Sequence, residues 1–322
     1  MTTAAMAISE LMRGLLTEGE GALARVGEGP YLVEIPTQDP AGRLGEALER
    51  HTSSTARTVA FDEGLLLDLK RIRGSSDARV WSLSDGATLG RSSGCRVHLS
   101  GEESVSKEHA RFVRLDGGWA VVDLGSTNGT FVGRERLPAE QPRPLEELVA
   151  LQAGSRRFAW VPREDLLALL TPVTSSDAIP LERLRFELTT LGSRRFLLRY
   201  TSAFLLISVR EEDAAAELRP REAFPLVGRG PLTLGRTSQA SITIRRGSVS
   251  KWHARLSLHG EDAWSLEDTG SSHGTVVNGR KLEKGAPPVK LAPWDALGFG
   301  PSVVGLYLTG RGVLEYLTDS ES

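Results

Sequence analysis

Short apolar runs separated by turn residues fill the chain between residues 60 and 162. The runs predicted as strands are residues 65–69, 80–83, 96–99, 110–115, 119–122, 130–132, 147–151 and 157–161. Turn sequences such as Asp85-Gly86 and Asn128-Gly129 lie between them. Many short strands with such turns indicate a β-sandwich or barrel. The leucines within 163–170 then predict a short helix that ends before Pro172.

The same order of short strands returns from about residue 203 to residue 312. Between the two β regions, residues 171–180 are rich in Pro, Ser and Thr, which predicts an exposed linker. Alternating apolar residues over 184–188 and an apolar run over 196–200 flank a Gly192-Ser193 turn. This pattern predicts a β-hairpin outside the repeat.

The N-terminal pattern is mixed. Apolar residues within 8–16 follow helical spacing, residues 31–35 read as a strand that ends at Pro36, and residues 44–50 as a second short helix. We expect a small α/β element that packs on its neighbour; a freely moving arm is the alternative. The predicted fold is mainly β. Its parts are an appended α/β segment (1–58), a sandwich (59–170), a linker with a hairpin (171–201), a second sandwich (202–315) and an acidic tail (316–322).

Polar motifs repeat together with the apolar pattern. The motif Thr-Leu-Gly-Arg at 88–91 returns at 233–236, and Val-Ser-Lys-x-His-Ala-Arg at 105–111 returns at 249–255. The motif Asp-x-Gly-Ser-x-x-Gly-Thr at 123–130 returns at 268–275. A spacing of about 145 residues indicates a duplicated domain, because solenoid repeats run to about 20–50 residues.

Composition narrows the range of functions. The 322 residues include 39 basic and 41 acidic side chains, a balance that argues against nucleic-acid or anionic-membrane binding. Cys95 is the single cysteine, so no intramolecular disulfide is possible. The chain shows no signal-peptide pattern, and its most apolar run, 203–209, is too short to span a bilayer. We therefore expect a cytoplasmic protein. Its arginine-rich, lysine-poor composition is typical of GC-rich bacteria.

The repeated motifs supply what a phosphorylated side chain needs from a binding site. A phosphate group carries about −1.5 to −2 charge and three acceptor oxygens, so it favours guanidinium, ammonium and hydroxyl donors. We expect three loops at one end of the first sandwich to bring such groups together. We call this set the first loop cluster; it consists of Arg91, Ser106, Lys107, Thr127 and Asn128.

The motifs Gly-Arg, Val-Ser-Lys-x-His-Ala and Asp-x-Gly-Ser-x-Asn-Gly-Thr, in this order, resemble the forkhead-associated (FHA) domain. The resemblance covers about residues 60–162 and 203–312. It implies a β-sandwich that binds phosphothreonine peptides through its loops. It further implies that Arg91 and Ser106 contact the phosphate, that Lys107 and Thr127 add to that contact, and that Asn128 holds the peptide main chain.

The second loop cluster consists of the corresponding residues Arg236, Ser250, Lys251, Ser272 and His273. The residues expected to act structurally are Gly90, His109 and Gly129 in the first copy and Gly235, His253 and Gly274 in the second. His273 departs from the pattern, because a histidine cannot pair with a backbone amide as the two-ended asparagine amide does. The second copy is therefore expected to bind more weakly, to bind something else, or to be a structural partner.

Three other functions are alternatives to phosphopeptide binding. An enzyme is disfavoured, because the sequence has no phosphate loop, zinc-ligand spacing or nucleophile elbow; no catalytic residue, metal or cofactor is expected. A phosphate-independent interaction scaffold is the main alternative, especially for the second sandwich. Nucleic-acid binding conflicts with the charge balance.

The expected role is an adaptor in Ser/Thr kinase signalling, with phosphothreonine-containing proteins and a Ser/Thr kinase as partners. Thr174, three residues before Asp177, and Thr318, in the acidic C-terminal stretch, are candidate phosphorylation sites for self-association. An unchanged hydrodynamic radius after phosphorylation of each threonine would contradict that hypothesis.

Overall fold

The structure is a computed structural model in which residues 5–18, 21–24, 27, 29–36, 63–73, 78–210, 219–228, 230–260 and 263–319 are described. The chain divides into two compact units, Met1–Thr171 and Pro172–Ser322. Each unit contains one seven-stranded and one five-stranded sheet, whose inner faces share a hydrophobic core. This arrangement confirms the prediction of a mainly β chain with two sandwiches in tandem.

In the first unit, the seven-stranded sheet has the order β1 (Met6–Ala7), β3 (Arg79–Ser82), β2 (Tyr31–Ile35), β12 (Arg156–Val161), β11 (Val149–Ala153), β8 (Thr130–Val132) and β9 (Glu135–Arg136). The five-stranded sheet has the order β10 (Pro142–Pro144), β7 (Gly118–Asp123), β6 (Ala110–Leu115), β4 (Thr88–Gly90) and β5 (Val97–His98). Strands β4 and β5 pair in parallel, so residues 91–96 lead from the end of β4 back to the start of β5.

The second unit repeats this topology. Its seven-stranded sheet has the order β13 (Ile179–Pro180), β15 (Glu222–Leu226), β14 (Ala203–Val209), β24 (Val303–Leu308), β23 (Ala296–Phe299), β20 (Thr275–Val277) and β21 (Arg280–Lys281). Its five-stranded sheet has the order β17 (Ile242–Thr243), β16 (Leu232–Gly235), β18 (Ala254–His259), β19 (Ala263–Asp268) and β22 (Val289–Lys290).

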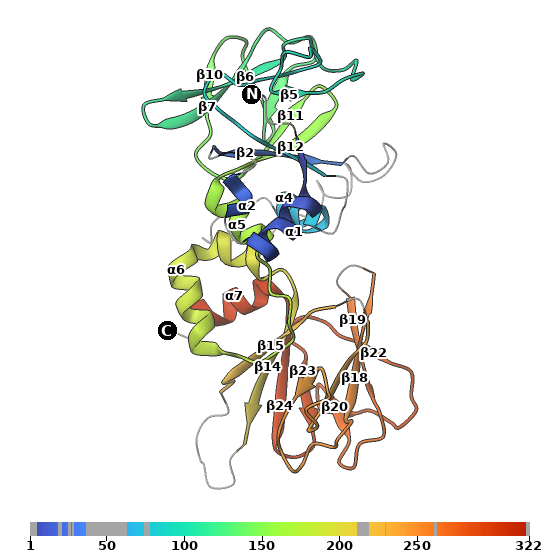
Figure 1. Ribbon diagram of the computed structural model, residues 1–322. Coiled ribbons are helices and arrows are strands. Elements are labelled where there is room, and N and C mark those ends of the chain that lie inside the picture. The colour runs from blue at the N-terminus through green and yellow to red at the C-terminus, as the bar shows by residue number, and fades with distance from the viewer. Residues whose placement is uncertain are drawn as a thin grey trace. The chain divides into compact units, whose positions relative to one another are not determined.

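Helices cover the outer face of each seven-stranded sheet (Figure 1). In the first unit they are α1 (Ile8–Glu18), α2 (Gly21–Ala24), α4 (Glu63–Arg73) and α5 (Arg163–Leu170). In the second unit they are α6 (Leu181–Arg199) and α7 (Gly310–Asp319). The helices predicted over 8–16 and 163–170 are confirmed as α1 and α5. The helix predicted over 44–50 lies outside the described residues.

Strand β14 shows why the most apolar run of the chain belongs inside a sandwich. Ala203, Leu205 and Ile207 face the core between the two sheets. Phe204 and Leu206 alternate with them and pack under α6 and α7. Because successive side chains of a strand point to opposite faces, a strand covered on both sides becomes apolar at every position.

The duplicated unit is larger than the repeated motifs. The series β1-α1-β2-β3 occupies the same places in the first unit as β13-α6-β14-β15 does in the second. Strand β2, assigned above to an appended N-terminal segment, pairs with β12 and β3 inside the seven-stranded sheet. Residues 36–78 connect β2 to β3, whereas only residues 210–221 connect β14 to β15. This difference in spacing hides the longer repeat from the sequence.

The prediction of a strand over residues 65–69 is wrong, because these residues lie in helix α4. Leu65, Leu69 and Ile72 are buried and follow one helical face, whereas Leu67 is 46% exposed. Lys70, Arg71 and Arg73 occupy the last turn, where positive charge interacts favourably with the helix dipole.

The predicted linker hairpin is also wrong: helix α6 occupies that segment. Leu181 and Leu184 lie one turn apart and are buried together with Phe196 beneath the helices. Gly192, placed above in a hairpin turn, instead breaks α6 into two helical parts with φ 74° and ψ 161°. The segment predicted as a tail from residue 316 begins in the last turns of α7, where Leu317 is buried.

Candidate functional site

The first loop cluster is built on a close approach between two backbone segments at the end of β4. A Cβ atom on Gly90 would lie 2.2 Å from the carbonyl oxygen of Lys107, and one on Gly235 would lie 2.0 Å from that of Lys251. Neither glycine is among the described residues with positive φ, so space rather than a left-handed backbone requires glycine here. The contact fixes the residue after each glycine, Arg91 or Arg236, at the sheet end.

Ser106 joins the three loops of the first loop cluster. The backbone N–H of Arg91 donates to the carbonyl oxygen of Ser106 at 3.0 Å. The backbone N–H of Thr127 donates to the Ser106 hydroxyl oxygen at 3.2 Å. The structure thus brings the predicted residues together: Arg91, Lys107, Thr127 and Asn128 are exposed around the half-buried Ser106.

His109 holds this arrangement from below. Its side chain is fully buried; Nδ1 accepts from the Ser106 N–H at 3.1 Å. The opposite nitrogen, Nε2, lies 3.1 Å from the Gly129 carbonyl oxygen and donates to it, because an accepting Nδ1 leaves the proton on Nε2. One neutral imidazole therefore links the Ser106 loop to the Asn128-Gly129 turn.

Asp123 braces the same turn. Its carboxylate accepts from the N–H of Ser126 at 2.9 Å, from the Ser126 hydroxyl at 2.6 Å and from the Thr130 hydroxyl at 2.5 Å. Burial acts to raise the pKa of Asp123, but these hydrogen bonds outweigh it and hold the pKa below its ordinary value. The carboxylate is thus committed to the turn.

Asn128 has a backbone partner that the sequence motifs do not predict. The side-chain amide of Asn128 donates to the carbonyl oxygen of Ser104 at 2.8 Å. This bond fixes the orientation of the amide and leaves its oxygen and its second N–H toward solvent. No motif signals Ser104, because its role depends on its main-chain oxygen rather than on its side chain.

The second loop cluster has the same framework. Ser250 accepts from the Arg236 N–H at its carbonyl oxygen (3.0 Å) and from the Ser272 N–H at its hydroxyl oxygen (3.0 Å). His253 is fully buried and links the Ser250 N–H (3.1 Å) to the Gly274 carbonyl oxygen (3.2 Å).

The two clusters differ in two details of hydrogen bonding. The Ser250 hydroxyl donates to the Ser272 hydroxyl at 3.4 Å, whereas Ser106 has no such acceptor in Thr127 among the described contacts. His273, exposed at the place of Asn128, has no hydrogen bond to another described residue, so nothing equivalent to the Asn128–Ser104 bond fixes its ring. Among described residues, the position expected to hold a peptide backbone thus lacks in the second cluster the bond that orients Asn128 in the first.

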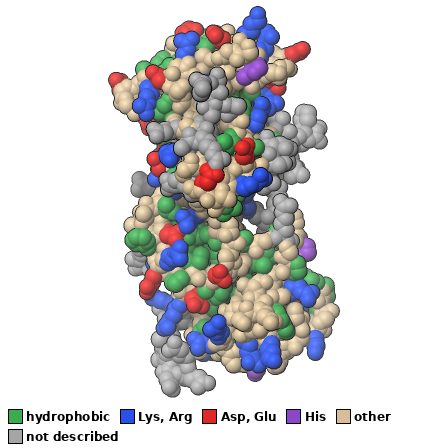
Figure 2. Space-filling view, in the orientation of Figure 1, with side chains coloured by type: hydrophobic (Ala, Val, Ile, Leu, Met, Phe, Trp, Pro, Cys, Tyr) green, Lys and Arg blue, Asp and Glu red, His purple; other side chains and the backbone are tan. Residues whose placement is uncertain are grey.

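Positive charge is concentrated at one place on the first unit rather than spread over it. Exposed Arg91 and Lys107 concentrate positive charge at the first loop cluster, while acidic and basic side chains are interspersed on the visible face of the first unit (Figure 2). Within the described residues no group of His, Cys, Asp and Glu could hold a metal ion. Likewise, no helix in the described part of the chain is both long and apolar enough to cross a membrane.

The two linking histidines predict a pH dependence of stability. Burial lowers the pKa of His109 and of His253 below the ordinary value of 6.5, so both are neutral in the folded protein. Below about pH 6.5 the unfolded chain binds more protons at these sites than the folded chain. The stability that these two histidines contribute is therefore fully present above about pH 6.5. It is lost as the pH falls from there toward their pKa values in the folded protein. Urea unfolding midpoints should be lower at pH 5.5 than at pH 7.5.

The control for this prediction is His109→Gln combined with His253→Gln. Glutamine can donate and accept as the imidazole does but does not titrate. The double variant should lose part of the difference between the two pH values. An equal difference in wild type and variant would show that other groups cause it.

The two sandwich regions of the chain match a known protein family. The FHA domain family matches residues 87–152 and 232–300. A stretch of 77 residues, 23% of this chain, is 48% identical to an oxoglutarate dehydrogenase inhibitor of Corynebacterium diphtheriae and covers 49% of it. The chain thus spans about half the length of that relative.

Two solved structures illustrate the structural similarity. An FHA domain from Chlamydia trachomatis is 28% identical, with a TM-score of 0.27, and the match covers 33% of this chain and 97% of that one. A structure on phosphothreonine-dependent FHA domain interactions is 23% identical, with a TM-score of 0.26, and covers 34% of this chain and 97% of that one.

Proposed function

Because the chain carries two FHA domains in tandem, we propose that it is a phosphothreonine-binding adaptor in Ser/Thr kinase signalling, with the first domain as the principal binder. FHA domains are interaction modules, so the proposed role is to recruit phosphorylated proteins while other proteins carry out the chemistry. The proposed place of action is the cytoplasm.

The observation that carries this proposal is the meeting of three loops at Ser106. The Ser106 hydroxyl oxygen accepts from the Thr127 N–H, which leaves its proton available to an incoming oxygen. Arg91, whose N–H bonds the Ser106 carbonyl oxygen, and Lys107, the next residue along the chain, are both exposed. A guanidinium, an ammonium and a hydroxyl proton are the donors that a phosphate dianion requires.

Asn128 supplies the second part of the proposed site. With one N–H bound to the Ser104 carbonyl oxygen, the amide presents a fixed oxygen and a fixed N–H. A peptide backbone offers the complementary N–H and C=O. We infer that Asn128 holds the main chain of the peptide whose phosphate contacts Arg91, Ser106, Lys107 and Thr127.

The second domain supports two candidate functions. The framework around Ser250 favours phosphate binding by Arg236, Ser250, Lys251 and Ser272. His273, without a fixing bond among described residues, favours a phosphate-independent interaction scaffold instead. Thr174 and Thr318 are both exposed, so self-association after their phosphorylation stays a hypothesis.

Binding of a phosphothreonine peptide library to the full chain tests the proposal. Phosphorylated peptides should bind, and the same peptides should lose binding after phosphatase treatment. A third set in which phosphoserine replaces phosphothreonine measures the preference for the extra methyl group. Binding that survives phosphatase treatment would favour the scaffold function, and a library that never binds would overturn phosphopeptide binding.

A further inference from the structure

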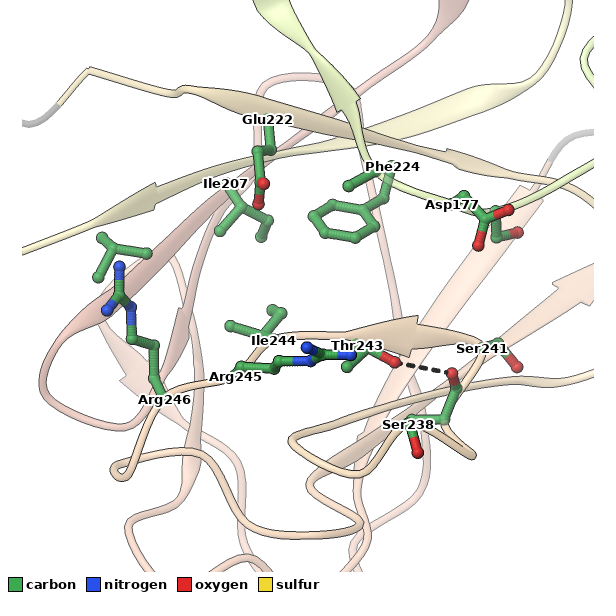
Figure 3. Close-up of a pocket in the computed structure, with 14 residues that line it drawn as sticks. Asp177, Ile207, Glu222, Phe224, Ser238, Ser241, Thr243, Ile244, Arg245 and Arg246 are labelled. Carbon is green, nitrogen blue, oxygen red and sulfur yellow. Dashed lines mark hydrogen bonds between the residues drawn. The ribbon is translucent and has the colours of Figure 1, made fainter.

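A groove opens along one side of the second sandwich. Its volume is about 490 Å³, and its lining comes from both sheets and from residues 176–178. Figure 3 shows Ile207, Glu222 and Phe224 on one side and Ile244 and Arg245 on the other. An apolar floor is thus bordered by charged and hydroxyl-bearing side chains.

On the corresponding side of the first sandwich Arg96 bridges the two sheets, and Arg79 and Trp81 lie on the facing strand β3. Arg96 donates from Nε to the carbonyl oxygen of Ser82 at 3.0 Å and so reaches across to the other sheet. The guanidinium of Arg79 lies 5.0 Å from the ring centroid of Trp81 and is paired with the buried carboxylate of Glu34. The Arg96–Ser82 bond joins the two sheets, whereas Arg79, Trp81 and Glu34 all belong to the seven-stranded sheet.

Arg96, Arg79 and Trp81 are each replaced in the second sandwich. By strand register, Trp81 corresponds to Phe224, Arg79 to Glu222, and Arg96 to Ser241. Ser241 bonds to its own sheet, accepting from the Thr233 N–H at 3.2 Å, and does not cross the gap. The second sandwich therefore has no counterpart of the Arg96–Ser82 bond, and Phe224 and Glu222 take the places of Trp81 and Arg79 at the groove.

The borders of the groove suit an extended peptide. Strands β13 and β17 are the edge strands of their sheets, and their residues or immediate neighbours line the groove. The free edge of β17 can pair with an added strand, whereas Pro180 in β13 has no N–H to donate. Arg245 and Arg246 are exposed and have no ion pair with any described residue. Glu222 and Asp177, on the opposite wall, carry the opposite charge.

One loop links the groove to the second loop cluster. Arg236 begins the loop that contributes Ser238 and Ala240 to the lining, and the Thr243 hydroxyl donates to the Thr237 carbonyl oxygen at 3.2 Å. A peptide whose phosphate reached Arg236 would have its neighbouring residues beside this opening.

We propose that the groove binds the segment flanking the phosphothreonine of the second domain's partner, in an extended conformation. This inference rests on the proposed function of the second domain. An apolar side chain of the segment lies on Phe224, Ile207 and Ile244, and an acidic side chain faces Arg245 and Arg246. The second domain's partner is thus recognised through the residues that flank its phosphothreonine as well as through the phosphate. This additional contact compensates for the histidine that stands at position 273 in place of asparagine.

The test uses the full chain carrying Arg91→Ala, which removes the proposed phosphate contact of the first domain. The probes are synthetic phosphothreonine peptides: a five-residue core, and longer forms with leucine and glutamate placed at successive positions on either side. Since burying a leucine side chain contributes at least the equivalent of a tenfold change in affinity, the best longer peptide should bind about tenfold more tightly than the core.

Three variants in that background locate the effect. Ser241→Arg restores the residue that bridges the two sheets of the first sandwich and should abolish the gain of the longer peptide while leaving core binding unchanged. Arg245→Glu with Arg246→Glu should reduce binding of the glutamate-bearing peptide. Arg280→Glu with Lys290→Glu reverses two exposed cations on β21 and β22 outside the lining; it is the charge-matched control and should change neither.

The outcomes separate the two proposals. If core and long peptides bind equally, or if Ser241→Arg leaves the gain intact, the groove proposal is wrong while phosphate binding stands. If no phosphopeptide binds in the Arg91→Ala background, or if Arg236→Ala has no effect on binding, the phosphate function of the second domain fails and the inference fails with it. Groove-dependent binding of unphosphorylated peptides would also overturn the inference and favour the scaffold function.

Discussion

Arg91→Ala is expected to abolish measurable phosphopeptide binding by the first domain. Arg91 is exposed at the loop junction, where its guanidinium can make two charge-assisted hydrogen bonds to a phosphate. Each such bond contributes about 1.5–3 kcal/mol, so losing two weakens binding by at least about a hundredfold. Titration of a phosphothreonine peptide against the full chain carrying Arg236→Ala, which removes the proposed second site, measures the change by calorimetry or anisotropy.

The substitution should leave the fold intact, because the structural contact of Arg91 is its backbone N–H to Ser106, which alanine retains. Arg91→Lys keeps the charge but loses the planar fork, so it should restore only part of the affinity. Arg134→Ala, in the turn between β8 and β9, removes an exposed arginine of the same unit and is the matched control. Equal affinities for Arg91→Ala and Arg134→Ala would refute the proposed role of Arg91.

Gly90→Ala is expected to destabilise the first unit by about 3 kcal/mol or more, although it adds a single methyl group. The new carbon would lie 2.2 Å from the Lys107 carbonyl oxygen and 2.9 Å from the Cys95 sulfur, so the backbone would have to separate. That separation would break the Arg91–Ser106 backbone bond that positions both proposed phosphate contacts. Urea unfolding and peptide binding should both report the loss.

Gly94→Ala is the matched control, since it lies four residues away and a Cβ there meets no atom within 4 Å. Its expected effect is between zero and about 1 kcal/mol of stabilisation, because alanine lowers the entropy of the unfolded chain. Gly235→Ala and Gly247→Ala form the equivalent pair in the second unit, with a contact of 2.0 Å at Gly235 and none within 4 Å at Gly247. Similar unfolding midpoints within either pair would show that the close approach is not required.

The tandem arrangement gives the substitutions Arg91→Ala and Arg236→Ala a further use. If both domains engage one doubly phosphorylated partner, the second contact becomes intramolecular and avidity rises by about 10²–10⁴. Arg91→Ala and Arg236→Ala, used singly and together, separate this avidity from the affinity of each domain.

The sequence by itself determined the two tandem sandwiches and the residues of both loop clusters. Short strands remained recognisable because one face of each outer strand is solvated, and the alternation of apolar and polar residues survives there, as in β6. The cluster residues remained recognisable because a site requires particular chemical groups, so Gly-Arg and Ser-Lys repeat as the same letters, whereas core positions repeat only as apolar residues.

Only the tertiary structure decided which segments belong to the sandwiches and where the second one is open. Strands β2 and β14 are covered on both faces, which removes the alternation that marks a strand, and leucines 65–67 fit a strand as well as a helix until burial on α4 distinguishes them. The groove depends on which side chains lie between the two sheets. The deciding positions are 79, 81 and 96 in the first unit and 222, 224 and 241 in the second. These positions lie far apart in the chain and meet only after folding.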